Sequence, residues 1–351
     1  MLSIILSLHQ YFFGINDRNI KLGKKRSLVS YVICNGMVRL CVGMLELYMW
    51  IYKALNLYPS PLCGREDVVV SLTTFPKRIN KVWMVIDSMF RQKDQPSKIV
   101  LYLINEEFPE GKKALPKRLL GYEKIGLEIH FRDTNLKPHN KYFYALQEFP
   151  DKNVVTIDDD YYYNRKHISN LLEVHRKYPD CVCANFIDVM TFDERGIKPY
   201  SEWICPVGEV EPNPLNVAMG FNAVLYPAWL VKDARQMFDV NLIRNLSLNA
   251  DDLWLKVLET VYGIDVAAGD YVSQGLLLMG SQSVTLMSTN CGEKKENDVY
   301  WKKMNDYFKI EEKLLERVRN ECTHPCQACW SRNESGKQVP PSKNTGVVQG
   351  A

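Results

Sequence analysis

The sequence has no marked excess of charge of either sign, no dense set of cysteines and no internal repeat. Its 351 residues include 44 Lys and Arg and 41 Asp and Glu, a formal net charge of +3. A general nucleic-acid binder carries a much larger positive charge, so we exclude that class of protein. The ten cysteines are scattered, unlike those of a small secreted disulfide protein. We therefore expect reduced thiols in a cytoplasmic setting.

A secretory signal peptide is not expected either. The first 13 residues are apolar, but no basic segment precedes them and no small-residue cleavage site follows closely. The composition, 46% hydrophobic and 24% charged, is that of a globular protein with one large or two modest domains.

One group of cysteines near the C-terminus has a spacing that deserves comparison with metal sites. Cys322, Cys326 and Cys329 form the pattern C-x3-C-x2-C, with His324 and His175 as possible fourth ligands. Zinc and iron–sulfur sites use such ligands. The spacing fits neither usual pattern, and no second C-x2-C pair is present. Ordinary thiols are the favoured interpretation, and a structural metal is the alternative.

The first 65 residues differ from the rest of the chain. A basic cluster precedes a long apolar stretch, residues 28–55, and consists of Lys21, Lys24, Lys25 and Arg26. The stretch is interrupted at intervals of four, seven and seven residues, which define one stripe of a helix, by Asn35, Arg39, Glu46 and Lys53. These charges make a membrane-spanning helix costly. We expect an amphipathic helix lying on an anionic membrane surface; the alternative is a helix packed on the main domain or on a partner subunit.

From residue 67 onward, short β-branched runs alternate with segments of helical period. The runs that predict strands are residues 68–72, 98–104, 127–131 and 154–157. The segments that predict helices are residues 79–92, 140–149 and 168–177, with a further helix from Ala250. Strands separated by helices imply crossover connections, so we predict an α/β fold with a mixed, mainly parallel sheet flanked by helices.

These patterns divide the chain into three parts. Residues 1–65 are the membrane-associating helical segment, and residues 66–310 are the α/β domain. Residues 311–351 hold the end of a helix, the cysteine group and, beyond residue 330, a tail without hydrophobic period that we expect to be disordered.

Three adjacent carboxylates, Asp158, Asp159 and Asp160, follow the strand predicted at residues 154–157. Three negative charges at a strand end repel one another, and a divalent cation held by oxygens would offset them. On an extended chain Asp158 and Asp160 project to the same side. They would then share one Mg²⁺ or Mn²⁺ and leave most of its shell open for diphosphate oxygens. The alternative is a turn or a helix-capping cluster.

A second polar segment, Thr73 to Arg78, follows the strand predicted at residues 68–72. Ligands of parallel sheets bind beyond the carboxyl ends of the strands. Both polar segments are expected at that edge, so a binding site is expected there.

The order of these motifs resembles that of bacterial GT-A-fold glycosyltransferases of surface-polysaccharide and lipopolysaccharide assembly. The resemblance covers residues 66–310 and rests on Ser-Leu-Thr-Thr-Phe-Pro-Lys-Arg-Ile, Val-Val-Thr-Ile-Asp-Asp-Asp and Asp-Asp-Leu-Trp-Leu-Lys. It implies a GT-A fold, a nucleotide-diphospho-sugar donor, a glycan or lipid-linked acceptor, and Mn²⁺ or Mg²⁺ as cofactor.

The resemblance also implies roles on the donor side. Asp160 matches the metal-binding aspartate of the D-x-D motif. Asp158 matches the first aspartate, which reaches the ribose or a metal-bound water. We count Asp159 among the nucleotide-sugar-binding candidates, and from its place in the triplet we expect it to face away in a more structural role. The loop that holds the nucleotide corresponds to Thr73, Thr74, Phe75 and Arg78. Lys141 stands where the family carries a basic residue that contacts the diphosphate.

On the acceptor side, Asp252 matches the catalytic base of inverting members, with Asp251 as the second choice. Both are otherwise favourable first-turn acids of a helix. Gly220 and Asn222 resemble the loop near the donor sugar and acceptor, where the family has more glycine. Large aromatic rings more often belong to the core, and stacking on sugars is the alternative for Trp203, Trp254 and Tyr226. His139, close to Lys141 in the sequence, is expected at the surface, and a place in the site is the alternative.

We therefore predict a metal-dependent, inverting glycosyltransferase in the cytoplasm, peripheral on the inner face of the cell membrane. One alternative is a retaining glycosyltransferase or a sugar nucleotidyltransferase on a similar fold. An alternative of another class is an inactive carbohydrate- or membrane-binding partner protein. The sequence leaves the donor sugar, the acceptor, the linkage and the oligomeric state open.

Overall fold

The structure of this protein is a computed structural model. It describes residues 1–21, 28–193, 196–206, 208–230, 235–270, 275–278, 296–321, 331–332 and 338–339.

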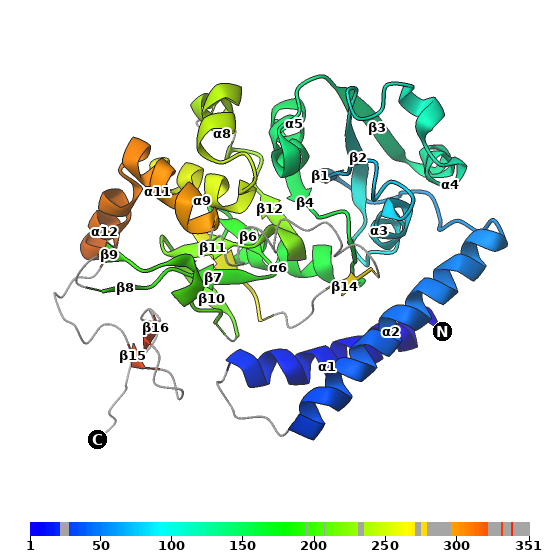
Figure 1. Cartoon of the computed structure of the whole chain (residues 1–351), viewed down its shortest axis with the longest axis horizontal. Helices are drawn as coiled ribbons and strands as arrows, with labels where there is room; N and C mark the ends of the chain where they lie inside the picture. Colours follow the sequence, from blue (N-terminus) through cyan, green and yellow to red (C-terminus); the bar gives the residue numbers. More distant parts are fainter. Residues whose placement is uncertain are drawn as a thin grey trace.

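An eight-stranded sheet runs through the centre of the molecule (Figure 1), in the order β10-β13-β6-β12-β4-β1-β2-β3. Its strands are β1 (Arg65–Thr73), β2 (Pro96–Ile104), β3 (Leu127–Arg132), β4 (Asn153–Thr156), β6 (Val182–Ala184), β10 (Val210–Asn213), β12 (Val224–Tyr226) and β13 (Val266–Ala268). Strands β10 and β12 pair antiparallel with their neighbours, and the other pairs are parallel. The predicted mixed, mainly parallel sheet is confirmed.

Short two-stranded sheets surround the central one. They pair β5 (Tyr161–Tyr162) with β14 (Leu276–Leu277), β7 (Ile187–Val189) with β11 (Asn216–Ala218), β8 (Phe192–Asp193) with β9 (Gly196–Ile197), and β15 (Ser331–Arg332) with β16 (Gln338–Val339). The first of these pairs follows the aspartate triplet directly.

Helices cover both faces of the sheet, as crossover connections require. The α-helices are α1 (Leu2–Lys21), α2 (Leu28–Ala54), α3 (Val82–Phe90), α4 (Lys117–Leu120), α5 (Asn140–Glu148), α6 (His167–Lys177), α8 (Val240–Leu246), α9 (Asp251–Val261), α11 (Glu296–Phe308) and α12 (Ile310–Glu321). The 3-10 turns are η1 (Gly111–Ala114), η2 (Gly121–Ile125), η3 (Lys137–His139), η4 (Tyr200–Glu202), η5 (Gly220–Asn222) and η6 (Arg235–Phe238). The strands and helices predicted between residues 68 and 177 are all present.

The alternation of side chains along β1 divides the core into two parts. Val68, Val70 and Leu72 point to the face covered by α3, α6 and the N-terminal helices, and Val69 points to the face covered by α5, α9, α11 and α12. All four side chains are fully buried. A continuous β-branched run therefore suits this central strand, because both of its faces are covered.

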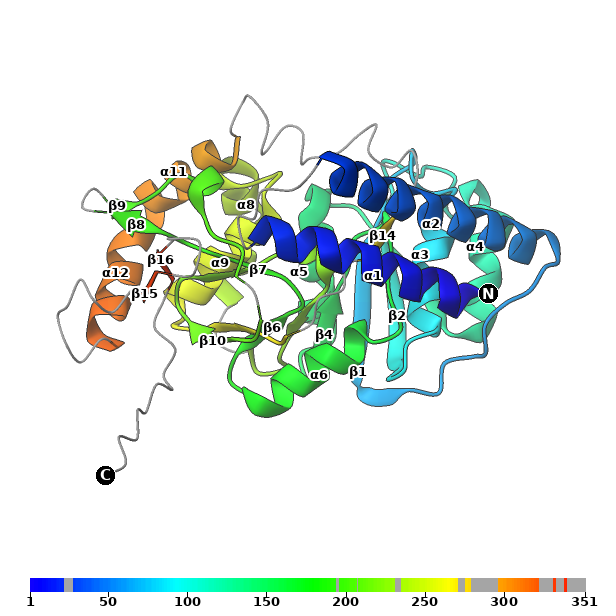
Figure 2. The same ribbon diagram turned by 90° about the horizontal axis from the view of Figure 1, so that it is seen from below.

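Helices α1 and α2, called the N-terminal helix pair below, lie against each other and against the α/β domain (Figures 1 and 2). The predicted amphipathic helix is present as α2, but the predicted polar stripe is not a single solvent-facing face. Glu46 is buried and its Oε2 lies 3.0 Å from Nζ of Lys81, whereas Arg39 is exposed. The difference arises because one face of α2 packs on the protein, and the only anionic side chain of the stripe meets a lysine there.

Helix α2 also has the length and composition to cross a membrane. Residues Tyr31–Ala54 have a mean hydropathy of 1.4, and 33% of the 18-residue apolar stretch within them is buried. Core helices of soluble proteins and signal sequences can pass the same test, so this is weak evidence for a span.

Arg118 joins the N-terminal helix pair to the α/β domain. Its guanidinium carbon lies 4.0 Å from the ring centre of Tyr58 and 4.8 Å from that of Trp83. The same group donates a hydrogen bond to the backbone carbonyl of Leu57, just beyond α2. Arginine stacks on aromatic faces while donating in its own plane. The chain leaving α2 is held in this way against α3 and α4.

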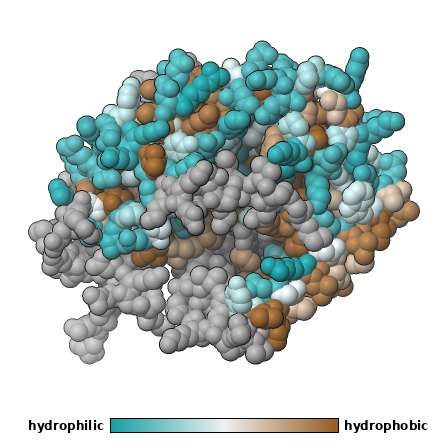
Figure 3. Space-filling model, in the orientation of Figure 1, coloured by the Kyte–Doolittle hydropathy of each residue, from teal (hydrophilic) through white to brown (hydrophobic). Residues whose placement is uncertain are grey.

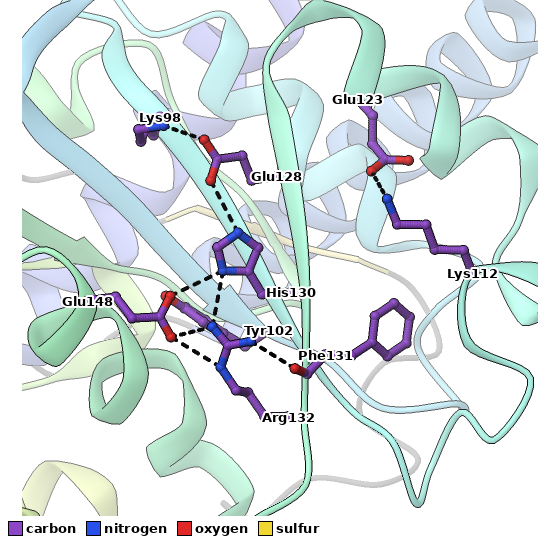
Figure 4. Close-up of polar contacts among 9 residues, drawn as sticks. All are labelled: Lys98, Tyr102, Lys112, Glu123, Glu128, His130, Phe131, Arg132 and Glu148. Atoms are coloured by element: carbon purple, nitrogen blue, oxygen red, sulfur yellow. Dashed lines mark hydrogen bonds and ion pairs between the residues drawn. The ribbon is translucent and has the colours of Figure 1, made fainter.

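Charged side chains line β3, at the edge of the sheet (Figure 4). Alternate positions place Glu128, His130 and Arg132 on one face. Glu148, at the end of α5, accepts hydrogen bonds from Tyr102 Oη at 3.1 Å and from Arg132. These contacts fix the C-terminal end of α5, and the N-terminal end of the same helix carries Lys141. Charges on an edge strand also discourage pairing with other chains.

Candidate active site

Three loops meet at the edge of the sheet where β1 and β4 end. The two strands are parallel neighbours, with Ser71 opposite Thr156, so the segments that follow them emerge side by side. Strand β12 runs antiparallel to β4, with Val224 opposite Thr156, so η5, which precedes β12, lies at the same edge. The structure therefore brings together the loop after β1, the aspartate triplet and Gly220, which are far apart in the sequence.

Arg78 and Thr74 hold the second aspartate of the triplet. Thr74 Oγ1 donates to Asp159 Oδ2, and an Arg78 Nη1–H donates to Asp159 Oδ1. The same Arg78 nitrogen lies 3.1 Å from Asp160 Oδ2. Asp159 thus has a structural role, but it faces the loop after β1 and not away from the site. The extended chain assumed for the triplet is not present, because residues 159 and 160 form a bend that brings both carboxylates to one guanidinium.

Lys141 joins the triplet to the acidic pair of α9. Its Nζ lies 2.6 Å from Asp158 Oδ1 and 2.9 Å from Asp251 Oδ2, and the side chain is buried. Burial alone would lower the pKa of Lys141, but Asp158, Asp251 and Asp252 raise the pKa well above its usual value. The lysine is therefore a permanent cation at the centre of the site.

Gly220 presents its backbone to the acidic pair. Its N–H donates to Asp252 Oδ1 at 3.1 Å. A Cβ at this position would lie 2.7 Å from Asp252 Oδ1 and 3.0 Å from Lys141 Nζ. A side chain here would displace the carboxylate or the lysine, so the close approach requires glycine.

The two carboxylates of α9 differ in acidity. Burial acts to raise the pKa of Asp251, but the positive charge of Lys141 and the nearby His139 hold it below the usual value. For Asp252, burial and the charges of Asp251 and Asp158 raise the pKa well above the usual value, against the opposing effect of Lys141. Asp251 is thus the ion-pair partner, and Asp252 is the stronger base of the two.

Negative charge exceeds positive charge in the site. Five carboxyl groups, the triplet and the α9 pair, surround the two cations Arg78 and Lys141. Burial and the charge of Asp158 raise the pKa of Asp160 to about 7, and Arg78 only partly offsets this. A divalent cation beside Asp160 and Asp158 would remove this repulsion, so the residues present fit the predicted metal.

The protein alone does not complete such a metal site. Within the described residues, no three His, Cys, Asp or Glu side chains are grouped so as to hold a metal ion. A metal held by two carboxylates needs oxygens from water or from a ligand such as a diphosphate. This donor set agrees with the open coordination shell expected from the sequence.

Other residues predicted for the site have structural contacts. Thr73 Oγ1 donates to the backbone carbonyl of Tyr102 at 3.0 Å. The ring centre of Phe75 lies 5.4 Å from the Arg78 guanidinium carbon. Asn222 is buried, and its Oδ1 accepts the Gly275 N–H at 3.3 Å. Asn222 therefore connects η5 to the segment that leads into β14.

The three aromatic candidates pack within the protein, and the expectation that His139 lies at the surface was wrong. Trp254 and Tyr226 are buried in the core and do not offer a face to a sugar. Trp203 packs edge-on against Trp301, with ring centres 5.8 Å apart. His139 is buried, not at the surface, and its Nε2 lies 2.7 Å from the Ser247 carbonyl oxygen. Large aromatic rings fill cores more often than they line sites.

Tyr163 is a site residue that the sequence analysis did not assign. Its hydroxyl accepts the Asp158 N–H at 2.9 Å and donates to the Phe221 carbonyl at 2.9 Å. One buried side chain thus fixes the first aspartate and η5 relative to each other. The run of three tyrosines after the triplet was the available signal, but spacing alone did not show which ring turns back toward the strand end.

Several predictions concern parts of the chain outside the described residues. Cys322, Cys326, Cys329 and His324 lie there, as do nearly all residues of the predicted disordered tail. The basic cluster also lies there, apart from Lys21 at the end of α1. His175 is described, on α6.

No family model and no curated protein matches the sequence. Among solved structures, a mannosyltransferase from Pyrobaculum calidifontis, in complex with GDP-mannose and Mn²⁺, matches 66% of this chain and 68% of its own, with 13% identity and a TM-score of 0.36. TarS from S. aureus, in complex with UDP, matches 60% of this chain and 59% of its own, with 14% identity and a TM-score of 0.38.

A third solved structure is 4-diphosphocytidyl-2C-methyl-D-erythritol synthase from Anaerococcus prevotii. It matches 64% of this chain and 95% of its own, with 13% identity and a TM-score of 0.39. All three TM-scores lie between 0.36 and 0.39. At TM-scores this low, the matches carry no argument about fold or activity.

Because the site holds an excess of negative charge, replacing Asp160 by a neutral side chain should stabilise the fold, and the gain should depend on pH. The Asp160 pKa of about 7 exceeds the ordinary value of 3.8, so the free energy of unfolding falls as the pH rises between these two values, and the loss levels off above about pH 7. At pH 8 and without metal, Asp160→Asn should raise the melting temperature by roughly 2 °C or more, and at pH 5 by much less. Differential scanning fluorimetry measures both values.

Asp151→Asn, a change at an exposed aspartate, is the control and should have little effect at either pH. Adding MnCl₂ should raise the melting temperature of the wild type and leave that of Asp160→Asn nearly unchanged. An equal shift for Asp160→Asn at both pH values would contradict the repulsion described here.

Proposed function

We propose that this protein is a metal-dependent glycosyltransferase that moves a sugar from a nucleotide-diphospho-sugar to an acceptor hydroxyl, with inversion at the anomeric carbon. The observation that carries the proposal is the bridge made by Lys141. It joins Asp158, on the side of the predicted donor diphosphate, to Asp251, beside a carboxylate of raised pKa. A transferase needs the site of its leaving group and its catalytic base close enough together that both act on the same pair of reacting substrates.

On the donor side, the positive charges belong to Arg78 and Lys141. Both are already paired with carboxylates, and both have the charge and the donors that bind phosphate oxygens. A diphosphate would compete with the aspartates for these cations. Asp160 and Asp158 would hold Mn²⁺ or Mg²⁺, which when bound acts as a Lewis acid for the departing diphosphate.

On the acceptor side, Asp252 is the base. Its raised pKa makes it a better proton acceptor than an ordinary carboxylate. The acceptor hydroxyl transfers its proton to Asp252 as its oxygen bonds to the anomeric carbon. The bond from that carbon to the phosphate oxygen breaks, and its electron pair leaves with the nucleoside diphosphate. A single displacement of this kind inverts the configuration.

The acceptor class and the cellular location are part of the same proposal. We take the acceptor to be a glycan or a lipid-linked glycan, and the location to be the cytoplasmic face of the membrane. The exposed apolar residues of the N-terminal helix pair support a peripheral position, because soluble monomers rarely expose a large contiguous apolar patch.

The first functional prediction is metal-dependent turnover of one nucleotide sugar. In a donor screen with Mn²⁺, the wild type should release nucleoside diphosphate from one member of the panel, and EDTA or Asp160→Ala should abolish the release. Asp151→Ala is the matched control and should keep the activity. Release of pyrophosphate from a nucleoside triphosphate and a sugar phosphate, with no turnover of any nucleotide sugar, would identify a nucleotidyltransferase. A product of retained configuration would rule out the inverting mechanism.

The second prediction separates the two acids of α9. Asp252→Asn should lower kcat by about 10²–10⁴-fold, because general-base catalysis contributes that much, and should leave donor affinity nearly unchanged. Asp251→Asn should instead strengthen donor binding, because it removes a carboxylate that competes with the diphosphate for Lys141. Steady-state kinetics with a donor titration gives both values.

The wild-type pH profile provides the matching test. Since the pKa of Asp252 is raised and only the ionised form accepts a proton, kcat/KM should rise with pH above the range in which an ordinary carboxyl titrates. The acidic limb should disappear in Asp252→Asn. A variant with nearly full activity and an unchanged limb would remove Asp252 from the mechanism.

A further inference from the structure

Helix α2 exposes a continuous apolar stripe along the side that faces away from the α/β domain. The residues of the stripe follow at intervals of seven, four, three, four and four, which is one face of a helix: Ile33, Leu40, Met44, Leu47, Ile51 and Leu55. Each is between 40% and 64% exposed. The opposite side of α2 packs on the protein through buried Cys41, Leu45 and Met49.

Helix α1 repeats the arrangement. Met1, Ile4, Leu8 and Tyr11, at helical spacing, are exposed, whereas Ile5 and Leu6 are buried in the core. Trp50 and Tyr31 of α2 add two large exposed rings. In Figure 3, hydrophobic residues gather along the lower right rim, over this helix pair. The exposed residues of α1 and α2, called the apolar face below, form the largest group of exposed hydrophobic side chains in the described residues.

The charge of this part of the chain indicates which partner covers the apolar face. The first 60 residues contain seven Lys and Arg and only two Asp and Glu, a net charge of +5, while the whole chain carries +3. The remainder is therefore slightly negative. An apolar helical face in a basic segment, with tryptophan and tyrosine among its residues, has the chemistry that binds the interface of an anionic bilayer.

The packing of α2 indicates that the pair lies on the bilayer and does not cross it. A spanning helix would surround Glu46 with lipid, but Glu46 is buried in an ion pair with Lys81. The core face of α2 would also have to leave the α/β domain. Lying flat, the helix pair keeps these contacts and offers only its outer face to lipid.

The helix pair also contacts both segments that build the active site. Asn164, four residues after Asp160, donates to Gln10 of α1 at 3.2 Å. Lys81, three residues after Arg78, pairs with Glu46 of α2, and its backbone N–H donates to the Arg78 carbonyl at 2.9 Å. A surface bound by the helix pair is therefore held in a fixed relation to the donor site.

We propose that α1 and α2 form a docking face for an anionic lipid bilayer, and that the acceptor of the reaction is borne by that bilayer. The assignment of an acceptor rests on the proposed glycosyltransferase function, and the docking face does not. An acceptor anchored in the same surface reaches the site by diffusion in two dimensions, which raises its effective concentration.

Vesicle flotation tests the docking face on the full-length protein. The wild type should float with phosphatidylcholine vesicles that contain phosphatidylglycerol, and less with pure phosphatidylcholine or at high salt, because salt screens the attraction. Leu47→Glu with Ile51→Glu should reduce the bound fraction roughly tenfold, since the charges would enter the lipid interface. The matched control variant carries Val299→Glu and Tyr307→Glu, which change two exposed apolar residues of α11. This variant should float with the vesicles as the wild type does.

Two outcomes would overturn the docking face. One is equal flotation of the wild type and the Leu47→Glu, Ile51→Glu variant. The other is a wild-type dimer in light scattering that the same variant converts to a monomer without any vesicle binding, because the apolar face would then be covered by a second copy of this chain.

Activity assays then test the acceptor separately. Metal-dependent hydrolysis of the donor without acceptor should be the same for the wild type and the Leu47→Glu, Ile51→Glu variant, which shows that the donor site is intact. Transfer to a lipid-linked acceptor in vesicles should fall with flotation, while transfer to the same glycan without lipid should be unchanged. Equal transfer to the lipid-linked acceptor by both proteins would overturn the proposal that the acceptor is borne by the membrane. If the wild type itself shows no hydrolysis of any donor, the proposed function is overturned instead.

Discussion

The site depends on one buried cation, Lys141, placed between carboxylates from two distant parts of the chain. Asp158 and Asp251 both lie within 3 Å of its Nζ, and their charges offset the cost of burying the lysine. Two other features of the structure are connected with the position of this lysine. Gly220 is glycine because a Cβ would meet Lys141 and Asp252, and α5 is tied to β2 and β3 at its far end by Glu148. Helix α5 is thus held at its N-terminal end by the ion pairs of Lys141 and at its C-terminal end by the hydrogen bonds of Glu148.

The same cation divides the acids of the site into two kinds. Asp251 is paired with Lys141, and its pKa is held below the usual value, so it stays ionised. Asp160 and Asp252 are buried with insufficient positive charge, and their pKa values are raised. One of the two stands where a divalent metal would supply the missing charge, and the other stands where a base is useful. Unequal acidity among neighbouring carboxylates is a common route to separate chemical roles.

The sequence was sufficient to predict the sheet, its crossover helices and the edge where the site lies. Hydrophobic periodicity and runs of β-branched residues predict helices and strands, β1 among them. The loops that follow parallel strands lie at the same edge of the sheet, which places the site there. Contacts among residues distant in sequence could not be predicted. The bend at Asp159 and Asp160 depends on Arg78, and the burial of Glu46 and Trp254 depends on which helix face meets the domain. Helical spacing identifies a stripe but does not show whether solvent, lipid or protein covers it.

The most direct test of this account is a calorimetric titration of nucleoside diphosphates, with Mn²⁺, into the wild type and Lys141→Met. If Lys141 is the cation shared by the donor site and the acids of α9, the variant should bind at least about tenfold more weakly, because it lacks a charged phosphate contact. Lys113→Met, a change at an exposed lysine, should bind as the wild type does. Equal affinity of a folded Lys141→Met and the wild type would contradict the central role given to this lysine.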